Sequence, residues 1–207
     1  MTKRILLINN YDSFTFNLQH LILEVSNAYT LDVKRNDEPF LTDLESGVYD
    51  GVVIGPGPGS PLDDDYFGHN KTVIQSFGTQ GLPILGICLG FQGIYNCFGG
   101  ALQVAKIPMH GTTSALHIQH NGTILKSIKT GVNVMRYHSL IADVHLGIPD
   151  CLLPLAYADD ARSNHINGAE LMAIEHVEHP IYGLQFHPES FATEQRTHYI
   201  TNFLSCC

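Results

Sequence analysis

Basic residues are scarce in this chain of 207 residues: Lys and Arg number 11 against 20 Asp and Glu, which gives a formal net charge of −9. Nucleic acids and anionic membrane surfaces attract proteins through a basic face, which such a balance does not favour. Long apolar runs are also missing, since no stretch approaches the roughly 18 residues that a membrane-spanning helix needs. We therefore expect neither a nucleic acid nor a membrane as a partner.

Cysteine occurs at only five positions, and no two of them have the Cys-x-x-Cys spacing of many metal and redox sites. The apolar run after Lys3 and Arg4 ends at Asn9, which is too short for the apolar region of a signal peptide. We therefore expect a cytoplasmic protein with reduced thiols. Cys206 and Cys207 are expected to lie in a frayed C-terminal tail.

Internal repeats, low-complexity tracts and linkers are absent as well, so we expect a single domain over residues 1–207. Up to about residue 100, apolar runs alternate with helical patterns, which predicts an α/β fold with a doubly wound, mostly parallel sheet flanked by helices, as in flavodoxin-like proteins. The expected strands there are 5–8, 30–34, 52–54 and 84–87, and the expected helices are 14–25, 40–46, 66–78 and one after 88. Shorter strands at 114–118, 132–136, 152–157 and 171–175 predict a small antiparallel extension. A core strand at 181–186 and a helix at 193–204 close the chain.

Cys88 lies in the sequence Gly86-Ile87-Cys88-Leu89-Gly90, directly after an apolar run that predicts a buried strand. Glycine two residues before and two residues after the central residue is typical of a nucleophile elbow, a sharp strand-to-helix turn that lifts a reactive side chain off the sheet. The N-terminus of the following helix would favour the thiolate. The alternative is a small, inert cysteine buried in a glycine-rich turn, and the spacing alone leaves both open.

The sequence His187-Pro188-Glu189 follows a second apolar run. Sites in α/β sheets form beyond the carboxyl ends of the strands, so Cys88 and His187 are expected to meet there. A histidine so placed takes the thiol proton and later protonates the leaving group, while a carboxylate behind the ring fixes its tautomer. Taken alone, His-Pro-Glu is more simply an ordinary turn.

The loop Gly55–Pro61 has almost no side chains, and no Gly-Lys-Ser/Thr follows it, so it is not a phosphate loop. A loop without Cβ atoms lets backbone N–H groups approach a ligand closely. The N–H groups of Gly59 and Leu89 could together form an oxyanion hole for a tetrahedral intermediate. A tight turn with no further role is the alternative.

Five segments carry a resemblance that covers nearly the whole chain. Two of them resemble the triad class (class I) of glutamine amidotransferases: Gly86–Gln92 and Gln185–Ser190. Three more are similar to the glutaminase subunits (component II) of anthranilate synthase and aminodeoxychorismate synthase: Asn10–Thr15, Gly55–Pro61 and Arg136–Leu140. One departure is Thr112, which stands after His110-Gly111 where these subunits usually have lysine; it leaves the triad intact and concerns contact with the synthase.

The resemblance implies that Cys88 attacks the side-chain amide of L-glutamine and forms a γ-glutamyl thioester, with His187 as acid and base and Glu189 orienting it. It assigns the oxyanion donors to Gly59 and Leu89, and glutamine binding to Gly57, Pro58, Gly59, Gln92, Ser139 and Leu140. The ammonia would pass to a separate chorismate-binding synthase subunit, which aminates chorismate. No cofactor is implied in this chain, and a Mg²⁺ requirement would belong to the synthase.

Two other functions compete with a glutaminase subunit. A stand-alone γ-glutamyl or peptide cysteine hydrolase would use the same thiol and imidazole, but the segment Arg136–Leu140 argues against it. A catalytically idle interaction subunit of the same fold is disfavoured by the complete triad. The pairs His117-x-x-His120 and His176-x-x-His179 have ligand-like spacing but lack a third clear ligand, so we predict no metal site.

Overall fold

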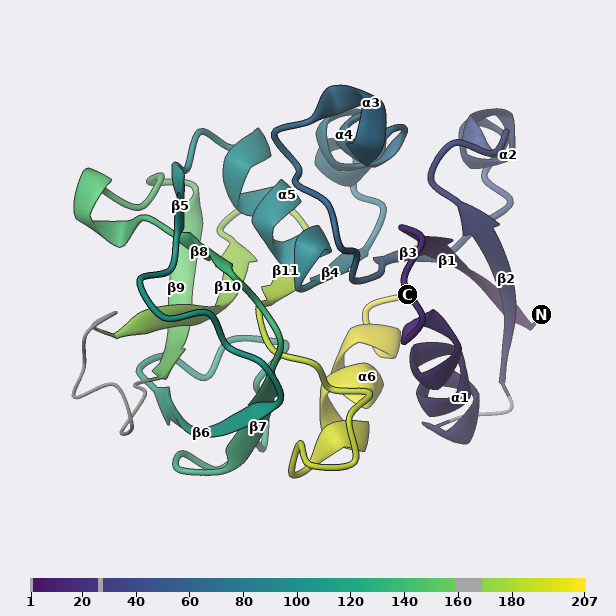
Figure 1. Cartoon of the computed structure of the whole chain (residues 1–207). Coiled ribbons are helices and arrows are strands. Elements are labelled where there is room, and N and C mark those ends of the chain that lie inside the picture. Colours follow the sequence, from purple (N-terminus) through teal and green to yellow (C-terminus); the bar gives the residue numbers. More distant parts are fainter. Residues whose placement is uncertain (1, 26–27, 159–168) are drawn as a thin grey trace.

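A computed structural model of the chain describes residues 2–25, 28–158 and 169–207, and one nine-stranded sheet runs through it (Figure 1). Across the sheet the strands are β2 (Tyr29–Arg35), β1 (Lys3–Asn9), β3 (Gly51–Ile54), β4 (Ile84–Ile87), β11 (Ile181–Leu184), β10 (Glu170–His176), β9 (Leu152–Ala158), β6 (Thr112–Ile118) and β7 (Asn133–Arg136). The strands from β2 to β11 are parallel, and those from β10 to β7 are antiparallel. The predicted fold class, a mostly parallel sheet with an antiparallel extension, is confirmed.

Helices cover both faces of the parallel strands, which explains why β3, β4 and β11 are apolar and buried along their whole length. One core contains side chains of α1 (Thr15–Val25) and α6 (Arg196–Leu204), and the other contains side chains of α2 (Leu41–Glu45) and α5 (Leu89–Cys97). Figure 1 shows α1 and α6 together on one side of the central strands and α3, α4 and α5 on the other. The buried central strands thus form a rigid support for the loops at their ends.

The helix expected at 66–78 is wrong as a single element. The segment instead contains α3 (Asp64–Phe67), α4 (Asn70–Thr72), a π-helical turn over Val73–Phe77 and a 3₁₀ turn over Gly78–Gln80. The break falls at Gly68, whose φ of 55° is not helical and which packs directly on the carbonyl of Asn36. Asp63 caps the new helix start by accepting a hydrogen bond from the Tyr66 N–H at 3.1 Å.

The expectation of a frayed C-terminal tail is also wrong. Cys206 and Cys207 are partly buried and pack against the core that contains α6. The Lys3 ammonium donates to the Cys207 carbonyl at 2.6 Å, and burial raises the pKa of the Cys207 thiol to about 12. Since α6 is itself held by buried aromatic side chains, it carries the last residues into contact with the sheet. The closing helix is also shorter than predicted, because it begins at Arg196.

A small two-stranded sheet, not predicted, joins β5 (Leu102–Val104) to β8 (Leu140–Ala142) in antiparallel register. Both strands are only three residues long, too short for a period-2 pattern to reveal. Within the described ranges, no helix combines the length and apolarity needed to cross a membrane.

Candidate active site

The backbone at Cys88 forms the sharp turn that the glycine spacing predicts. Cys88 connects β4 to α5 with φ 52° and ψ −98°, a conformation that a residue with a Cβ adopts only under strain. The side chain is nearly buried. A strained residue between a buried strand and a helix N-terminus holds its side chain in one direction, as an attacking nucleophile requires.

Gly86 and Gly90 are needed because α5 approaches the strands at backbone distance. A Cβ at Gly86 would overlap the backbone carbonyl of Gly90, and a Cβ at Gly90 would overlap the carbonyl oxygen of Ile54. Neither obstacle is a flexible side chain that could move away. The two glycines therefore set how close the helix that starts after Cys88 lies to the sheet.

His187 and Glu189 lie beyond the end of β11, which pairs in parallel with β4 so that Leu184 faces Ile87. Both are buried, with 3% and 5% of their surface exposed, and the Nδ1 of His187 lies 2.6 Å from the Glu189 Oε1. The backbone fixes the imidazole as well: the His187 N–H donates to the Met135 carbonyl at 2.9 Å, and its carbonyl accepts from the Thr193 hydroxyl at 2.6 Å. The sequence-predicted pair is therefore assembled and rigid.

The electrostatics of His187 favour its charged form. Burial disfavours the imidazolium, but the Glu189 carboxylate and the Cys88 sulfur outweigh burial and raise the pKa of His187 well above its ordinary value. Glu189 occupies Nδ1, and the buried Nε2 has no partner at hydrogen-bonding geometry among the described residues. The structure thus brings all three predicted triad residues together, with one ring nitrogen left for the reaction.

A cavity of about 400 Å³ opens at Cys88. It contains six of the residues assigned by resemblance to oxyanion or glutamine binding, and its full lining is Gly57, Pro58, Gly59, Ser60, Cys88, Gln92, Tyr137, His138, Ser139 and Leu140. Leu89, the other expected oxyanion donor, is the first residue of α5, where backbone N–H groups have no partner within the helix. These residues come from three loops, helix α5 and the first residue of β8, which the topology gathers at one edge of the sheet.

The Tyr66 ring packs against Gly59, one of the predicted oxyanion donors. Burial raises the pKa of Tyr66, and the nearby Gly59 N–H acts in the opposite direction. The Tyr66 ring covers Gly59 so closely that a Cβ there would overlap it, and its hydroxyl donates to the Asn10 carbonyl at 2.7 Å. The Tyr66 ring therefore leaves room only for glycine at position 59.

Gln185 is a residue that the sequence interpretation did not select. Its fully buried amide accepts from the Gln92 Nε2 at 3.3 Å and donates to the Cys88 sulfur at 3.7 Å. Gln92 in turn donates to the Leu140 carbonyl at 2.9 Å. A chain of amides thus connects the predicted glutamine-binding residues to the thiol. Its only sequence signal was the position of Gln185 just before Phe186 and His187 in a matched motif.

Replacing Gln185 with methionine, which has a similar volume, is expected to slow alkylation of Cys88 by iodoacetamide about tenfold, because a hydrogen bond to a charged group contributes about 1.5 kcal/mol or more. The rate is measured by mass spectrometry of the peptide that contains Cys88. Gln185→Glu should slow the reaction further, since a carboxylate repels the thiolate. An unchanged rate in both variants would contradict a role for the Gln185 amide at the sulfur.

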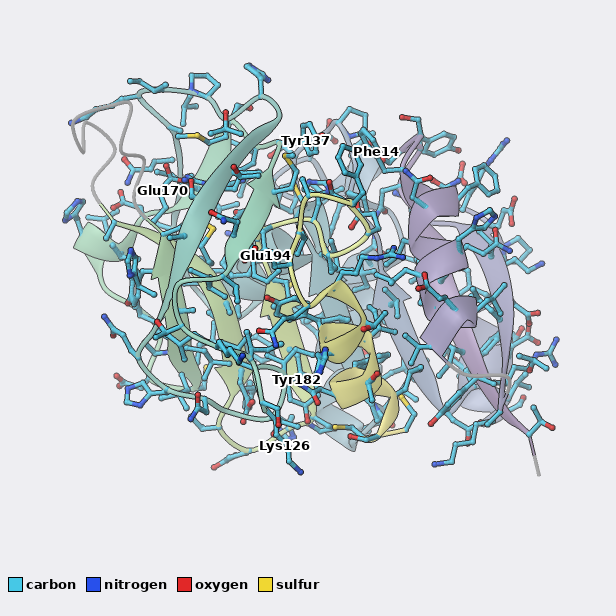
Figure 2. The ribbon with its side chains drawn as sticks, turned by 90° about the horizontal axis from the view of Figure 1, so that it is seen from below. Phe14, Lys126, Tyr137, Glu170, Tyr182 and Glu194 are labelled. Carbon is cyan, nitrogen blue, oxygen red and sulfur yellow. The ribbon has the colours of Figure 1, made fainter. Side chains whose placement is uncertain are left out.

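Aromatic side chains cover the imidazole. The rings of Phe14 and Tyr137 stack with centroids 5.4 Å apart, and Tyr137 meets the His187 ring edge-on at 5.2 Å. Figure 2 shows Phe14 and Tyr137 side by side at one end of the molecule. Both rings are partly exposed, so they separate His187 from solvent without closing the site.

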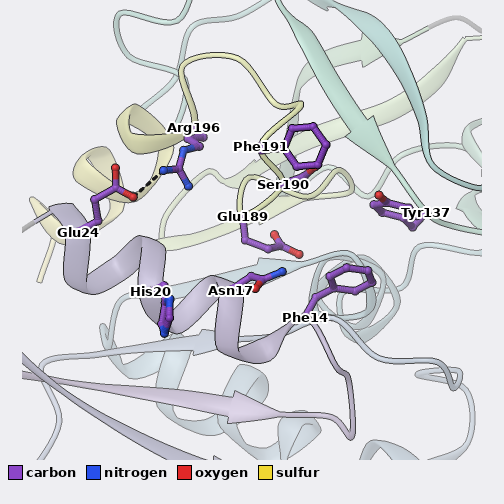
Figure 3. Close-up of a pocket in the computed structure, with 9 residues that line it drawn as sticks. All are labelled: Phe14, Asn17, His20, Glu24, Tyr137, Glu189, Ser190, Phe191 and Arg196. Atoms are coloured by element: carbon purple, nitrogen blue, oxygen red, sulfur yellow. Dashed lines mark hydrogen bonds and ion pairs between the residues drawn. The ribbon is translucent and has the colours of Figure 1, made fainter.

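A second cavity, of about 500 Å³, lies beside the pair His187 and Glu189 (Figure 3). Glu189 and Tyr137 form part of its wall, and the full lining is Phe14, Asn17, His20, Glu24, Tyr137, Glu189, Ser190, Phe191 and Arg196. Arg196 forms an ion pair with Glu24 at 2.6 Å across its far end. Tyr137 lines both cavities and therefore stands between them.

One of the histidine pairs considered as metal ligands, His176 and His179, makes local contacts instead. The His176 and His179 rings lie 4.6 Å apart, and the His176 Nδ1 accepts the N–H groups of Glu178 and His179 at 3.1 Å each. In the part of the chain that the structure describes, no group of three or more His, Cys, Asp or Glu side chains is arranged to hold a metal ion.

Comparison with known proteins agrees with this geometry. The family model described as "Glutamine amidotransferase class-I" matches residues 6–206. The chain is 38% identical to "Anthranilate synthase component 2" of Leptospira biflexa, covering 98% of this chain and 99% of that protein. It is 39% identical to "Aminodeoxychorismate synthase" of Streptomyces pristinaespiralis, covering 98% of this chain but 26% of that protein.

Among solved structures, one described as a GMP synthase subunit from Thermoplasma acidophilum superposes with a TM-score of 0.81 at 23% identity, over 100% of this chain and 94% of that one. A glutamine amidotransferase from Thermotoga maritima gives a TM-score of 0.68 at 17% identity, over 99% of this chain and 84% of that one. At these identities the likeness concerns the fold.

Proposed function

The chain belongs to the class I glutamine amidotransferases, and from that premise we propose that it hydrolyses L-glutamine and delivers the ammonia to a chorismate-binding synthase subunit. The observation that carries the proposal is the strained Cys88 beside the buried pair His187 and Glu189, at the mouth of a cavity lined by the glutamine-binding segments. An amide is a poor electrophile with a poor leaving group, so this combination of thiolate, proton donor and N–H donors fits the substrate.

The reaction begins with attack of the Cys88 thiolate on the side-chain carbonyl carbon of glutamine. The carbonyl oxygen becomes an oxyanion, for which the N–H groups of Leu89 and Gly59 are the proposed donors. His187, charged because of its raised pKa, gives its Nε2 proton to the amide nitrogen, and the C–N bond breaks to release ammonia. The product is a γ-glutamyl thioester on Cys88.

The second half returns the enzyme to its starting state. Neutral His187 takes a proton from water, and the resulting hydroxide attacks the thioester carbon. The C–S bond breaks, glutamate leaves and Cys88 is a thiolate again, beside an imidazolium. Throughout, Glu189 holds Nδ1–H and leaves Nε2 as the exchanging atom.

The synthase is proposed to bind over the aromatic rim of this site. Three exposed aromatic side chains line the two cavities: Phe14, Tyr137 and Phe191. Phe191, in the loop directly after the triad, is 93% exposed. Apolar side chains gathered at one edge mark an interaction surface more often than a solvated one. A partner seated there would cover the site from which ammonia leaves.

The reaction would proceed in the cytoplasm, where the five free thiols stay reduced.

Glutamate release with and without the synthase tests the proposal. A glutaminase subunit is expected to be markedly stimulated by its synthase. A stand-alone hydrolase would be fully active alone, and an idle subunit would be inactive in both cases, so either result would contradict the proposal.

Phe191→Ser is expected to lower the synthase's stimulation of glutamate release about tenfold, because a large apolar side chain at the centre of an interface contributes about 1.4 kcal/mol or more. Val177→Ser is the matched control: Val177 is also exposed, at 56%, but it follows the end of β10 at the opposite edge of the sheet. Titration of the synthase against each variant gives the stimulation and its midpoint. Equal effects of the two substitutions would place the interface elsewhere.

A further inference from the structure

A buried ion pair lies behind the glutamine-binding segment, outside the triad. The Nη2 of Arg136, on β7, is 2.6 Å from the Oε2 of Glu170, on β10, and neither side chain is more than 1% exposed. The same Glu170 oxygen lies 2.8 Å from the Nε2 of His138. The Nη1 of Arg136 donates to the Ser114 hydroxyl at 2.9 Å. Two antiparallel strands and the segment after β7 are thus joined through one carboxylate.

The charges in this network are well defined. Burial lowers the pKa of His138 and outweighs the opposing bond to Glu170. For Glu170, burial acts upward, but the bond from His138 and the charge of Arg136 outweigh it and lower the pKa. Glu170 is therefore ionised and His138 neutral, so the single ring proton must lie on Nε2, which faces the carboxylate. This fixes both the tautomer and the ring direction of His138.

The segment that contains His138 lines the glutamine cavity and follows closely after a residue that holds His187. Residues 137–140 line the glutamine cavity, and the Leu140 carbonyl accepts from Gln92. On β7, just before this segment, the Met135 carbonyl accepts the His187 N–H. A shift of His138 would therefore move the walls of the cavity, while His187 keeps its own bonds to Glu189 and Thr193.

We propose that Arg136 and Glu170 are positioning residues for glutamine: through His138 they hold the segment 137–140 in the conformation that binds the substrate. This inference rests on the proposed glutaminase function. Neither side chain touches the cavity, since neither is among its lining residues. Their effect reaches the substrate only through the segment that their charges anchor.

Glu170→Gln in the full chain tests this role. The substitution keeps the shape but removes the charge that holds both Arg136 and His138. The KM for L-glutamine is expected to rise about 10-fold to 100-fold, as when a binding group is misplaced by about 1 Å, while kcat stays within about twofold. A kcat that fell while KM stayed constant would overturn the proposal, because the network would then act on the nucleophile.

Glu175→Gln is the matched control on the same strand. Glu175 is likewise a carboxylate with a hydrogen-bond partner, the Thr123 N–H at 2.6 Å, but it lies at the other end of β10 from the site. Its KM should equal that of the wild type. If Glu170→Gln folds and its KM is no higher than that of Glu175→Gln, the proposal fails.

A double variant separates positioning from stability. Glu170→Gln leaves a buried guanidinium unpaired, whereas Arg136→Met with Glu170→Leu removes both charges, and replacing a buried ion pair by apolar side chains often preserves stability. The proposal expects the double variant to melt near the wild-type temperature but to keep the raised KM. If the double variant had both the melting temperature and the KM of the wild type, the ion pair would only stabilise the fold. Should Glu170→Gln fail to fold, the double variant decides alone. A wild-type chain inactive toward glutamine, with and without its synthase, would instead contradict the proposed function.

Discussion

Cys88→Ser is expected to abolish glutamine-dependent amination by the complex of this chain with its synthase, lowering it at least about 10⁴-fold, while amination from added ammonium salts continues. A serine hydroxyl in the same strained turn has the right direction but remains protonated next to a histidine that is already charged. Only the glutaminase step needs the thiolate. Ammonia supplied from solution enters after that step and reaches the synthase without it.

Cys97→Ser is the control for this substitution. Cys97 is the last residue of the same helix, and burial raises the pKa of its thiol to about 11, so it is not a competing nucleophile. Both activities should survive in that variant. Both are followed by product formation from chorismate, with glutamine or an ammonium salt as nitrogen source. If Cys88→Ser still used glutamine at more than a trace rate, the nucleophile would have to be another residue.

The triad could be predicted from the sequence because each of its parts has a local signature. The glycines on either side of Cys88 indicate a tight turn, at positions where a Cβ would overlap the backbone. His187 and Glu189 closely follow an apolar strand in the sequence. Parallel strands place their carboxyl ends at one edge, so two such signatures in different parts of the chain have to converge there. The pairing of β4 with β11 is the contact that makes this happen.

Other parts of the site have no local signature. Arg136 and Glu170 are 34 residues apart, on strands that are not neighbours in the sheet. The residues around them in the sequence do not predict that they form an ion pair. Gln185 looked like one more residue of a core strand, although its amide faces the thiol. The broken helix after Asp63 has the same cause, since Gly68 is placed by its contact with Asn36 rather than by its neighbours in sequence. Tertiary contact, which periodicity does not encode, decided all three.

Glu189→Gln is expected to lower kcat for glutamine hydrolysis about 10²-fold to 10⁴-fold, the range that a positioned acid and base contributes. The amide can still touch Nδ1, so the imidazole keeps its place. The substitution removes the buried negative charge 2.6 Å from the ring, which is the largest of the effects that oppose burial and raise the pKa of His187. A neutral His187 cannot protonate the departing nitrogen.

The pH profile distinguishes this loss of charge from a loss of position. Because Glu189 raises the pKa of His187, removing it lowers that pKa, and the basic limb of glutamate release, where the imidazolium loses its proton, moves to lower pH. Glu194→Gln is the matched control: Glu194 lies in the same loop and accepts the Asn133 N–H at 2.8 Å, but it does not touch the ring. Its profile should not move. A Glu189→Gln profile that fell in height without moving would mean that the carboxylate only orients His187, and that the proton for ammonia comes from a different group.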